Sequence, residues 1–437
     1  MNRPGTSVTS ASLLLAPLAV LAFSSGAAAA ERDLTLDEAL VLASKNNATL
    51  QSARAGADVA SASVGLAWAA LLPQLSLQGK YTHNYREVTV PGGQDLIQPL
   101  EQLDGTVSLT VPLIVPPVYP ALRAAQSSRA SAEAEFAAAR EAILFSTAQT
   151  FFLAAGADEI VAARDSAIRV AQKTLEDARA RVTAGAANDV EAQRAEVALL
   201  RAEQALDGAR YARDQSYRAL ATILSLRVPF RVRPPPPPVA GSSNDKGDVL
   251  AALTLRPELA SLEHALRANR SQVSSAKLAW APTLSGFGVA SAHNHPGFTG
   301  DNHFWAAGLQ LEWRLYDGGT RDAQRRISAA QVRDGEARLR LERDTVADEV
   351  ADGEHALATL RRALVTANRS AELVRQTLDL VRVQYGAGTA TQLDLLTAQD
   401  SLAFSEVAAA QARFDLALAR LALDRVTGRL YKPNRLE

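Results

Sequence analysis

The sequence contains no cysteine among its 437 residues, and only 5% of them are aromatic. Without thiols the chain can form no disulfide framework, no thiolate metal site and no cysteine nucleophile, and it has no N-terminal cysteine to carry a lipid. The sequence also has no excess of charge of either sign, because its 46 basic residues nearly balance its 47 acidic residues. Because proteins that bind nucleic acid usually carry a basic excess, the composition gives no support for a nucleic acid partner.

Long apolar runs are scarce as well, and one of them lies at the N-terminus. "LLLAPLAVLAF" at 13–23 follows Arg3 and precedes the small residues of 24–30, which is the pattern of a secretory signal peptide. We predict a signal peptide at 1–30 and an exported mature protein. No later stretch approaches ~20 continuous apolar residues, so residence in a membrane would require β-barrel strands or surface attachment.

The rest of the sequence is internally duplicated. "DARARVTAGAANDVEAQRAEVAL" (177–199) aligns with "LVRVQYGAGTATQLDLLTAQDSL" (380–402), and residues 46–79 align with 255–288. Two copies are too few for a solenoid and indicate one pseudo-symmetric unit. We expect a first repeat at 31–227, a proline-rich linker at 228–248, a second repeat at 249–426 and a C-terminal tail at 427–437.

Each repeat contains a long helical segment with coiled-coil spacing. Apolar residues recur every seven positions upstream of both breaks, for example at Ile168 and Leu175 in the first repeat and at Ala371 and Leu378 in the second. This is the period of a coiled-coil seam. We predict long helices at roughly 121–184 and 320–387, each on the order of 100 Å in length at ~1.5 Å per residue.

Two stretches in each repeat have the alternating pattern of β-strands, at about 73–85 and 105–114 and at about 282–293 and 304–316. All four tryptophans lie at or beside these strands. Alternation also occurs in soluble sandwiches, but short strands flanked by aromatic residues, with one polar face, favour a transmembrane barrel. Four strands cannot close a barrel and would leave two open edges, so we expect several copies around a common axis.

Four motifs resemble those of a known family. They are "LTLDEALVLASKNNATL" (34–50), "LLPQLSLQGKY" (71–81), "WRLYDGGTRDA" (313–323) and "QYGAGTATQLDLLTAQ" (384–399). In their order and spacing they resemble the outer-membrane efflux proteins, the TolC-like channels of Gram-negative bacteria. The resemblance covers essentially all of the mature chain.

The resemblance implies an α+β membrane protein in which three protomers, with four strands each, form one twelve-stranded β-barrel. The helices would continue as a coiled-coil tunnel across the periplasm. The implied function is the outer-membrane exit duct of a tripartite efflux or type I secretion system. The implied partners are two further copies of the chain, a periplasmic adaptor (membrane-fusion) protein, an inner-membrane pump of RND, ABC or MFS type, and outer-membrane lipid. A soluble periplasmic coiled-coil adaptor or scaffold is the alternative, although it has no need for aromatic-flanked strands.

The break at 384–400 interrupts the second long helix, and the same break occurs in the first repeat. Gly388 can adopt the left-handed conformation that ends a helix, and Thr391 can cap the next one. Asp394 then occupies the position of a capping-box acid. The equivalent places in the first repeat are held by Gly185, Asn188 and Glu191.

Two hypotheses remain open for these acids. Asp394 and Glu191 could serve as helix caps alone, or in a symmetric assembly they could also form carboxylate rings that attract cations at the narrow end of the tunnel. By the resemblance, Tyr385 matches a position that holds the tip closed. The best-known member has arginine in place of Ala390 and an acid in place of Thr397, so we expect its gate-locking charge pairs to be absent or rearranged here.

No catalytic or cofactor site is expected. The sequence has no glycine-rich phosphate loop, no nucleophile elbow and no carboxylate pair with a reason to be buried. His293, His295 and His303 lie close together in the sequence, but three histidines without a nearby acidic or thiolate set favour a solvated extracellular loop over a metal site.

Overall fold

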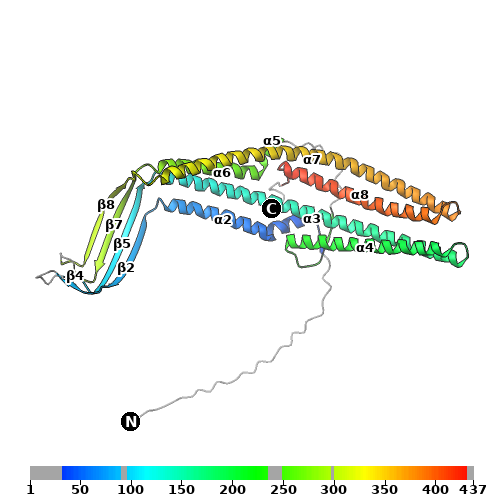
Figure 1. Cartoon of the computed structure of the whole chain (residues 1–437), viewed down its shortest axis with the longest axis horizontal. Coiled ribbons are helices and arrows are strands. Elements are labelled where there is room, and N and C mark those ends of the chain that lie inside the picture. Colours follow the sequence, from blue (N-terminus) through cyan, green and yellow to red (C-terminus); the bar gives the residue numbers. More distant parts are fainter. Residues whose placement is uncertain (1–31, 90–95, 235–248, 297–299, 431–437) are drawn as a thin grey trace, which may run out of the picture.

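The chain is elongated, with a β-sheet at one end and helical hairpin turns at the other (Figure 1). The computed structural model describes residues 32–89, 96–234, 249–296 and 300–430. The predicted signal peptide, residues 235–248 of the predicted linker and most of the predicted tail lie outside the described residues.

The first half contains β1 (Arg32–Leu34), α1 (Leu36–Asn46), α2 (Ala48–Ala69), β2 (Gln74–His83), β3 (Val88–Thr89), β4 (Leu96–Gln98), β5 (Glu101–Ile114), α3 (Val118–Thr183), α4 (Asp189–Leu224) and β6 (Phe230–Val232). The second half contains α5 (Val249–Leu255), α6 (Pro257–Leu278), β7 (Thr283–His293), β8 (His303–Glu312), α7 (Thr320–Gly386) and α8 (Gln392–Val426).

The lengths of the elements repeat between the halves. Helices α2 and α6 have 22 residues each, α3 and α7 have 66 and 67, and α4 and α8 have 36 and 35. The long helices each pack against the following helix to form two antiparallel hairpins, α3–α4 and α7–α8. No helix among the described residues combines the length and apolar character needed to cross a membrane.

The opening helix of each repeat is divided in two, which the hydrophobic pattern did not predict. Asn47 ends α1 and caps α2, because its side-chain oxygen accepts hydrogen bonds from the amides of Thr49 (3.0 Å) and Leu50 (3.2 Å). Its side-chain amide donates to the carbonyl of Ile223 at the end of α4. In the second half, Pro257 occupies the first turn of α6, where its missing N–H costs nothing.

The four main strands form one antiparallel sheet in the order β2-β5-β7-β8. The two halves meet at its centre, where Val107 of β5 pairs with Ala290 of β7. Strand β8 ends at Glu312, earlier than the expected 316, and the Trp313 indole instead donates to the Trp280 carbonyl (3.1 Å). The outer edges of β2 and β8 have no strand partner in the described part of the chain.

The main core is built almost entirely by the first half of the chain, with Phe414 of α8 as its one buried member from the second half. Phe151, Leu220 and Leu224 are fully buried, together with small residues that let the helices approach closely. The first residues of the predicted proline-rich linker include a short strand, β6, which the sequence pattern does not predict. Strand β6 pairs in parallel with β1, because Phe230 and Val232 alternate inward into this core.

Candidate functional site at the helical tip

Each helical hairpin turns at a glycine in the left-handed conformation. Gly185 has φ 69° and Gly388 has φ 76°, a region that residues with a Cβ occupy at a cost. In the second hairpin the Gly388 amide donates to the Tyr385 carbonyl (3.1 Å) and the Thr389 amide to the Gln384 carbonyl (2.9 Å). These bonds satisfy carbonyls that the end of α7 leaves free, so the turn is sharp and defined.

The helix that follows each turn is capped by a side chain, but the two caps differ. The Thr391 hydroxyl accepts from the Asp394 amide (3.2 Å), and the Asp394 carboxylate accepts from the Thr391 amide (2.9 Å), which completes a capping box. In the first hairpin the Asn188 side chain accepts from the Glu191 amide (3.2 Å). The Glu191 carboxylate makes no return bond to Asn188 and is therefore available for another partner.

That partner is on the other hairpin. The Tyr385 hydroxyl donates to Glu191 Oε2 across 3.1 Å, and the Gln392 side-chain amide donates to the Glu191 backbone carbonyl. Burial of the phenol, and then the bond to Glu191, raise the pKa of Tyr385 above its usual value. The phenol therefore stays protonated and able to donate at neutral pH. Glu191 of the first repeat thus accepts hydrogen bonds from two residues of the second repeat, Tyr385 and Gln392.

Arg181 adds a third contact between the hairpins. Its guanidinium lies over the Tyr385 ring, 4.6 Å from the ring centroid, in the arrangement of a cation–π interaction. Its Nε is buried and has no hydrogen-bond partner among the described residues. The two hairpins are thus joined at the tip by two hydrogen bonds and one cation–π contact.

Asp394 remains with its own helix and makes no described contact with the first hairpin. Its side chain is exposed, and the bonds from the Thr391 hydroxyl and amide lower the pKa of its carboxyl. It is therefore an ionised, solvent-facing carboxylate at neutral pH. The structure thus brings Tyr385 and Glu191 together and leaves Asp394 apart.

Arg181 and Gln392 are tip contacts that the sequence pattern does not predict. Gln392 is only 4% exposed, but a polar residue next to a helix cap gives no sign of being buried. Arg181 lies one turn before Gly185, in a helix with many arginines, so nothing in the pattern separates it from a solvated residue.

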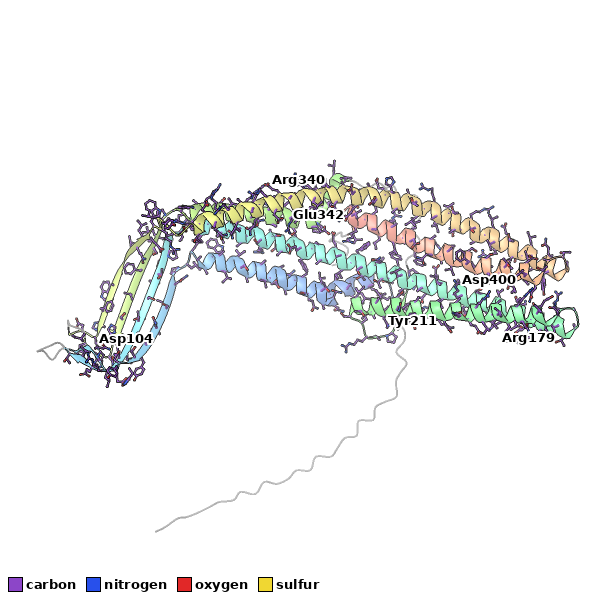
Figure 2. All side chains as sticks on the ribbon, viewed as in Figure 1. Asp104, Arg179, Tyr211, Arg340, Glu342 and Asp400 are labelled. Carbon is purple, nitrogen blue, oxygen red and sulfur yellow. The ribbon has the colours of Figure 1, made fainter. Side chains whose placement is uncertain are left out.

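The three histidines at the opposite end of the molecule are engaged separately. His293 Nδ1 lies 2.7 Å from Asp104, His295 Nε2 lies 3.1 Å from the Glu101 carbonyl, and His303 Nδ1 lies 3.2 Å from Asn302. Figure 2 shows Asp104 at the far end of the sheet from the helical tips. Among the residues that the structure describes, no group of three potential ligands could hold a metal ion.

Comparison with known proteins identifies a family over most of the chain. The family described as "Outer membrane efflux protein" matches residues 39–225 and 250–429. Among curated proteins, the outer membrane efflux protein BepC of Brucella suis biovar 1 (strain 1330) is 28% identical over 411 residues, which cover 91% of this chain and 86% of BepC.

Solved structures share the fold. The CmeC outer membrane channel of Campylobacter jejuni matches with a TM-score of 0.76 at 18% identity, covering 91% of this chain and 86% of CmeC. The outer membrane protein VceC of Vibrio cholerae matches with a TM-score of 0.76 at 21% identity, covering 90% of this chain and 96% of VceC.

Proposed function

The chain belongs to the outer membrane efflux protein family, and from that membership we infer that it is an exit duct of the outer membrane. It resides in the outer membrane, extends into the periplasm and passes substrates outward as part of a tripartite system with an inner-membrane pump and a periplasmic adaptor. It is a conduit and not an enzyme. The alternative of a soluble periplasmic adaptor or scaffold is wrong.

We propose that three copies close one twelve-stranded barrel, with β8 of each copy beside β2 of the next. The supporting observation is the pair of unpartnered sheet edges, which in hydrocarbon would leave N–H and C=O groups without partners. The sheet also carries large exposed apolar side chains, such as Leu77 (80% exposed), Trp305 (77%) and Leu309 (70%). We propose outer-membrane lipid as the partner of these side chains.

In this assembly the long helices line a periplasmic tunnel, and the hairpin turns lie at its inner end. We propose that the domain plan is the duplicated one, with a signal peptide at 1–30, repeats at 31–227 and 249–426, a linker at 228–248 and a tail at 427–437. The adaptor (membrane-fusion) protein would contact the tip, and the pump would be of RND, ABC or MFS type. The duct would serve efflux or type I secretion.

We further propose that the tip is the gate. The contact of Tyr385 with Glu191 joins the two hairpins of one protomer, so its loss would free α7–α8 to move away from α3–α4. Gly185, Asn188, Gly388 and Thr391 define the turns that carry these residues. Asp394, repeated three times around the axis, would form an exposed carboxylate ring that attracts cations.

The carboxylate ring can be tested by the ion selectivity of the protein in planar lipid bilayers. Asp394→Asn removes three charges from the proposed constriction, and we expect the cation/anion permeability ratio to fall while the trimer persists. The matched control is Asp207→Asn, which removes an exposed carboxylate in the middle of α4. Equal selectivity in wild type and Asp394→Asn would exclude the ring, whereas a detergent-solubilised protein that never forms conducting channels would contradict the duct itself.

A further inference from the structure

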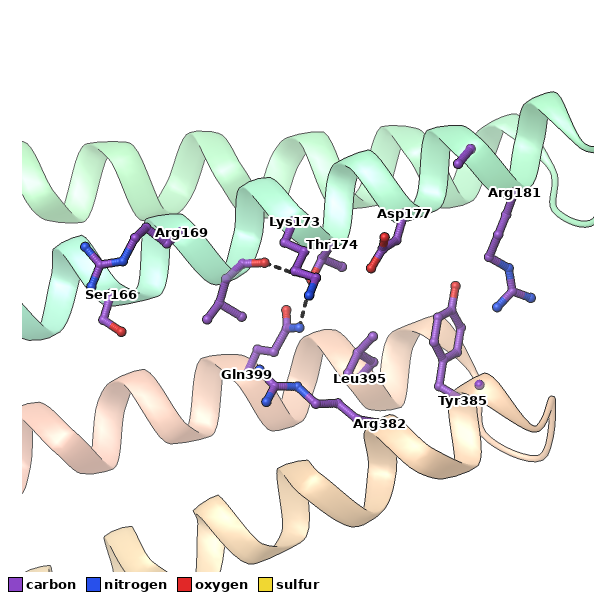
Figure 3. A pocket seen from close by; sticks show the side chains of 13 residues that line it. Ser166, Arg169, Lys173, Thr174, Asp177, Arg181, Arg382, Tyr385, Leu395 and Gln399 are labelled. Carbon is purple, nitrogen blue, oxygen red and sulfur yellow. Dashed lines mark hydrogen bonds between the residues drawn. The ribbon is translucent and has the colours of Figure 1, made fainter.

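A cavity of about 820 Å³ lies between the two helical hairpins, next to the tip (Figure 3). Helix α3 forms one wall, and α7 and α8 form the other. Four cationic side chains line it: Arg169, Lys173 and Arg181 from α3, and Arg382 from α7. Asp177 is the single carboxylate among the lining residues, so the cavity has a clear excess of positive charge.

These cations are only weakly neutralised by the protein. Arg169 pairs with Asp165 and Arg382 with Asp379, but both pairs lie along a single helix and are well exposed, which makes them worth little. Lys173 has no ion-pair partner among the described residues. Arg181 has a buried Nε without a hydrogen-bond partner. A buried donor without an acceptor is costly, so this guanidinium is suited to a ligand oxygen.

We propose that this cavity binds a small multivalent anion of the phosphate or polycarboxylate class. Guanidinium groups match the oxygen pairs of such anions with two parallel hydrogen bonds, and an ammonium adds a compact point charge. Lys173 on the α3 wall and Arg382 on the α7 wall lie on either side of Gln399 in Figure 3, so one anion between them contacts both hairpins. Arg169 and Arg181 lie at opposite ends of the cavity and add to its positive charge. The volume is within the range of small-molecule sites and exceeds what a monovalent halide requires.

The bound anion bridges the two hairpins. Its lining comes from α3, α7 and α8 and is complete only while the two hairpins lie together, so binding favours that arrangement over any in which they separate. The site adjoins the contact of Tyr385 with Arg181, which joins the same two helices. The bridging therefore holds the tip closed. This consequence rests on the proposed function, whereas the binding itself does not.

Binding is tested by isothermal titration calorimetry on the full-length protein in detergent. The probes are inorganic phosphate, pyrophosphate and citrate, each compared with chloride at equal ionic strength. We expect Lys173→Gln and Arg382→Gln to weaken citrate binding about tenfold each, the loss of one charge-assisted contact. Lys173→Arg keeps the charge and should bind nearly as well as wild type.

Two further variants separate a site from general electrostatics. Asp177→Asn removes the carboxylate that lines the cavity and should tighten binding. Arg338→Gln removes an exposed cation of α7 that pairs with Asp334 outside the cavity, and it should leave binding unchanged. Circular dichroism melting confirms that each variant is folded. An affinity that is the same in all variants, or that chloride matches at equal ionic strength, overturns the site.

The bridging is tested in planar bilayers with citrate on the tip side. We expect citrate to lower the conductance of the wild type and to have about tenfold less potency on Lys173→Gln. Calorimetric binding without any change in conductance overturns the bridging. A protein that binds citrate but forms no channels would contradict the proposed function and support the binding site alone.

Discussion

The contact between Tyr385 and Glu191 makes a quantitative prediction for gating. Tyr385→Phe deletes one hydroxyl and keeps the ring under the Arg181 guanidinium. A hydrogen bond to a charged group contributes roughly 1.5–3 kcal/mol. Glu191 is only partly buried and can be hydrated when the hydroxyl is lost, so we expect the lower end, about 1.5 kcal/mol. That corresponds to a shift of about tenfold per protomer toward the separated hairpins.

In a trimer the effect multiplies if the three protomers open together, to about a thousandfold. The assay is single-channel recording in planar bilayers, with open probability and conductance measured for wild type and variant. The control is Tyr211→Phe, because Tyr211 lies on α4, is 63% exposed and sits away from the tip (Figure 2). We expect Tyr211→Phe to leave the open probability unchanged.

The raised pKa of Tyr385 sharpens this prediction. Burial and the Glu191 contact raise the pKa of the phenol, so it stays protonated to higher pH than an exposed tyrosine. The difference in open probability between wild type and Tyr385→Phe should therefore persist at pH 9. An open probability that is equal in Tyr385→Phe and wild type, at both pH 7 and pH 9, would refute the role of this contact in closing the tip.

Two further predictions concern stability and are checked by thermal unfolding. Burial, and then the charge of Glu258, raise the pKa of the buried Glu141 to about 7, against the opposing charge of Arg256. Between pH 4.5 and 7 the folded state therefore keeps a proton on this carboxyl that the unfolded state releases. The free energy of unfolding should fall by up to about 3 kcal/mol as the pH rises across that range. Glu141→Gln should remove this part of the slope, and an unchanged slope would contradict the assignment. Gly388→Ala should destabilise the protein by about 1 kcal/mol, because its φ is 76° and the added Cβ meets only open space, so backbone strain is the sole cost. Gly208→Ala inside α4 should instead stabilise it by about 0.5–1 kcal/mol. Changes in stability of the same sign for both variants would refute the backbone argument.

The long helices were the most predictable part of the fold. Helices were expected at 121–184 and 320–387, and α3 and α7 span Val118–Thr183 and Thr320–Gly386. A seven-residue period sustained over many turns specifies a helix independently of what packs on it. Leu175 and Leu378 of the predicted seams are both buried against the following helix.

Features that depend on distant partners were not predicted. Strand β6 pairs with β1, which lies almost 200 residues earlier, and its side chains pack into the core beside β1. A pattern as short as Phe230–Val232, beside a proline run, carries too little periodicity to indicate a strand. The division of the opening helix at Asn47 likewise depends on its bond to Ile223 at the end of α4.

The tip illustrates the same limit at the level of single residues. The turns and caps involve residues within five positions of one another, so the local preferences of glycine for helix ends and of threonine for helix caps predict them from the sequence. The contact of Tyr385 with Glu191 spans 194 positions. It joins residues that the duplication does not pair with each other, and only the packing of the two hairpins brings them together.

The most direct test of the account is single-particle electron microscopy of the protein extracted in detergent from isolated outer membranes. We predict a threefold cylinder in which β8 of each copy lies beside β2 of the next, and the helices continue from the sheet as a long tube ending at Gly185 and Gly388. Single chains whose β2 and β8 edges remain unpaired, or an assembly without a closed ring of strands, would contradict the channel.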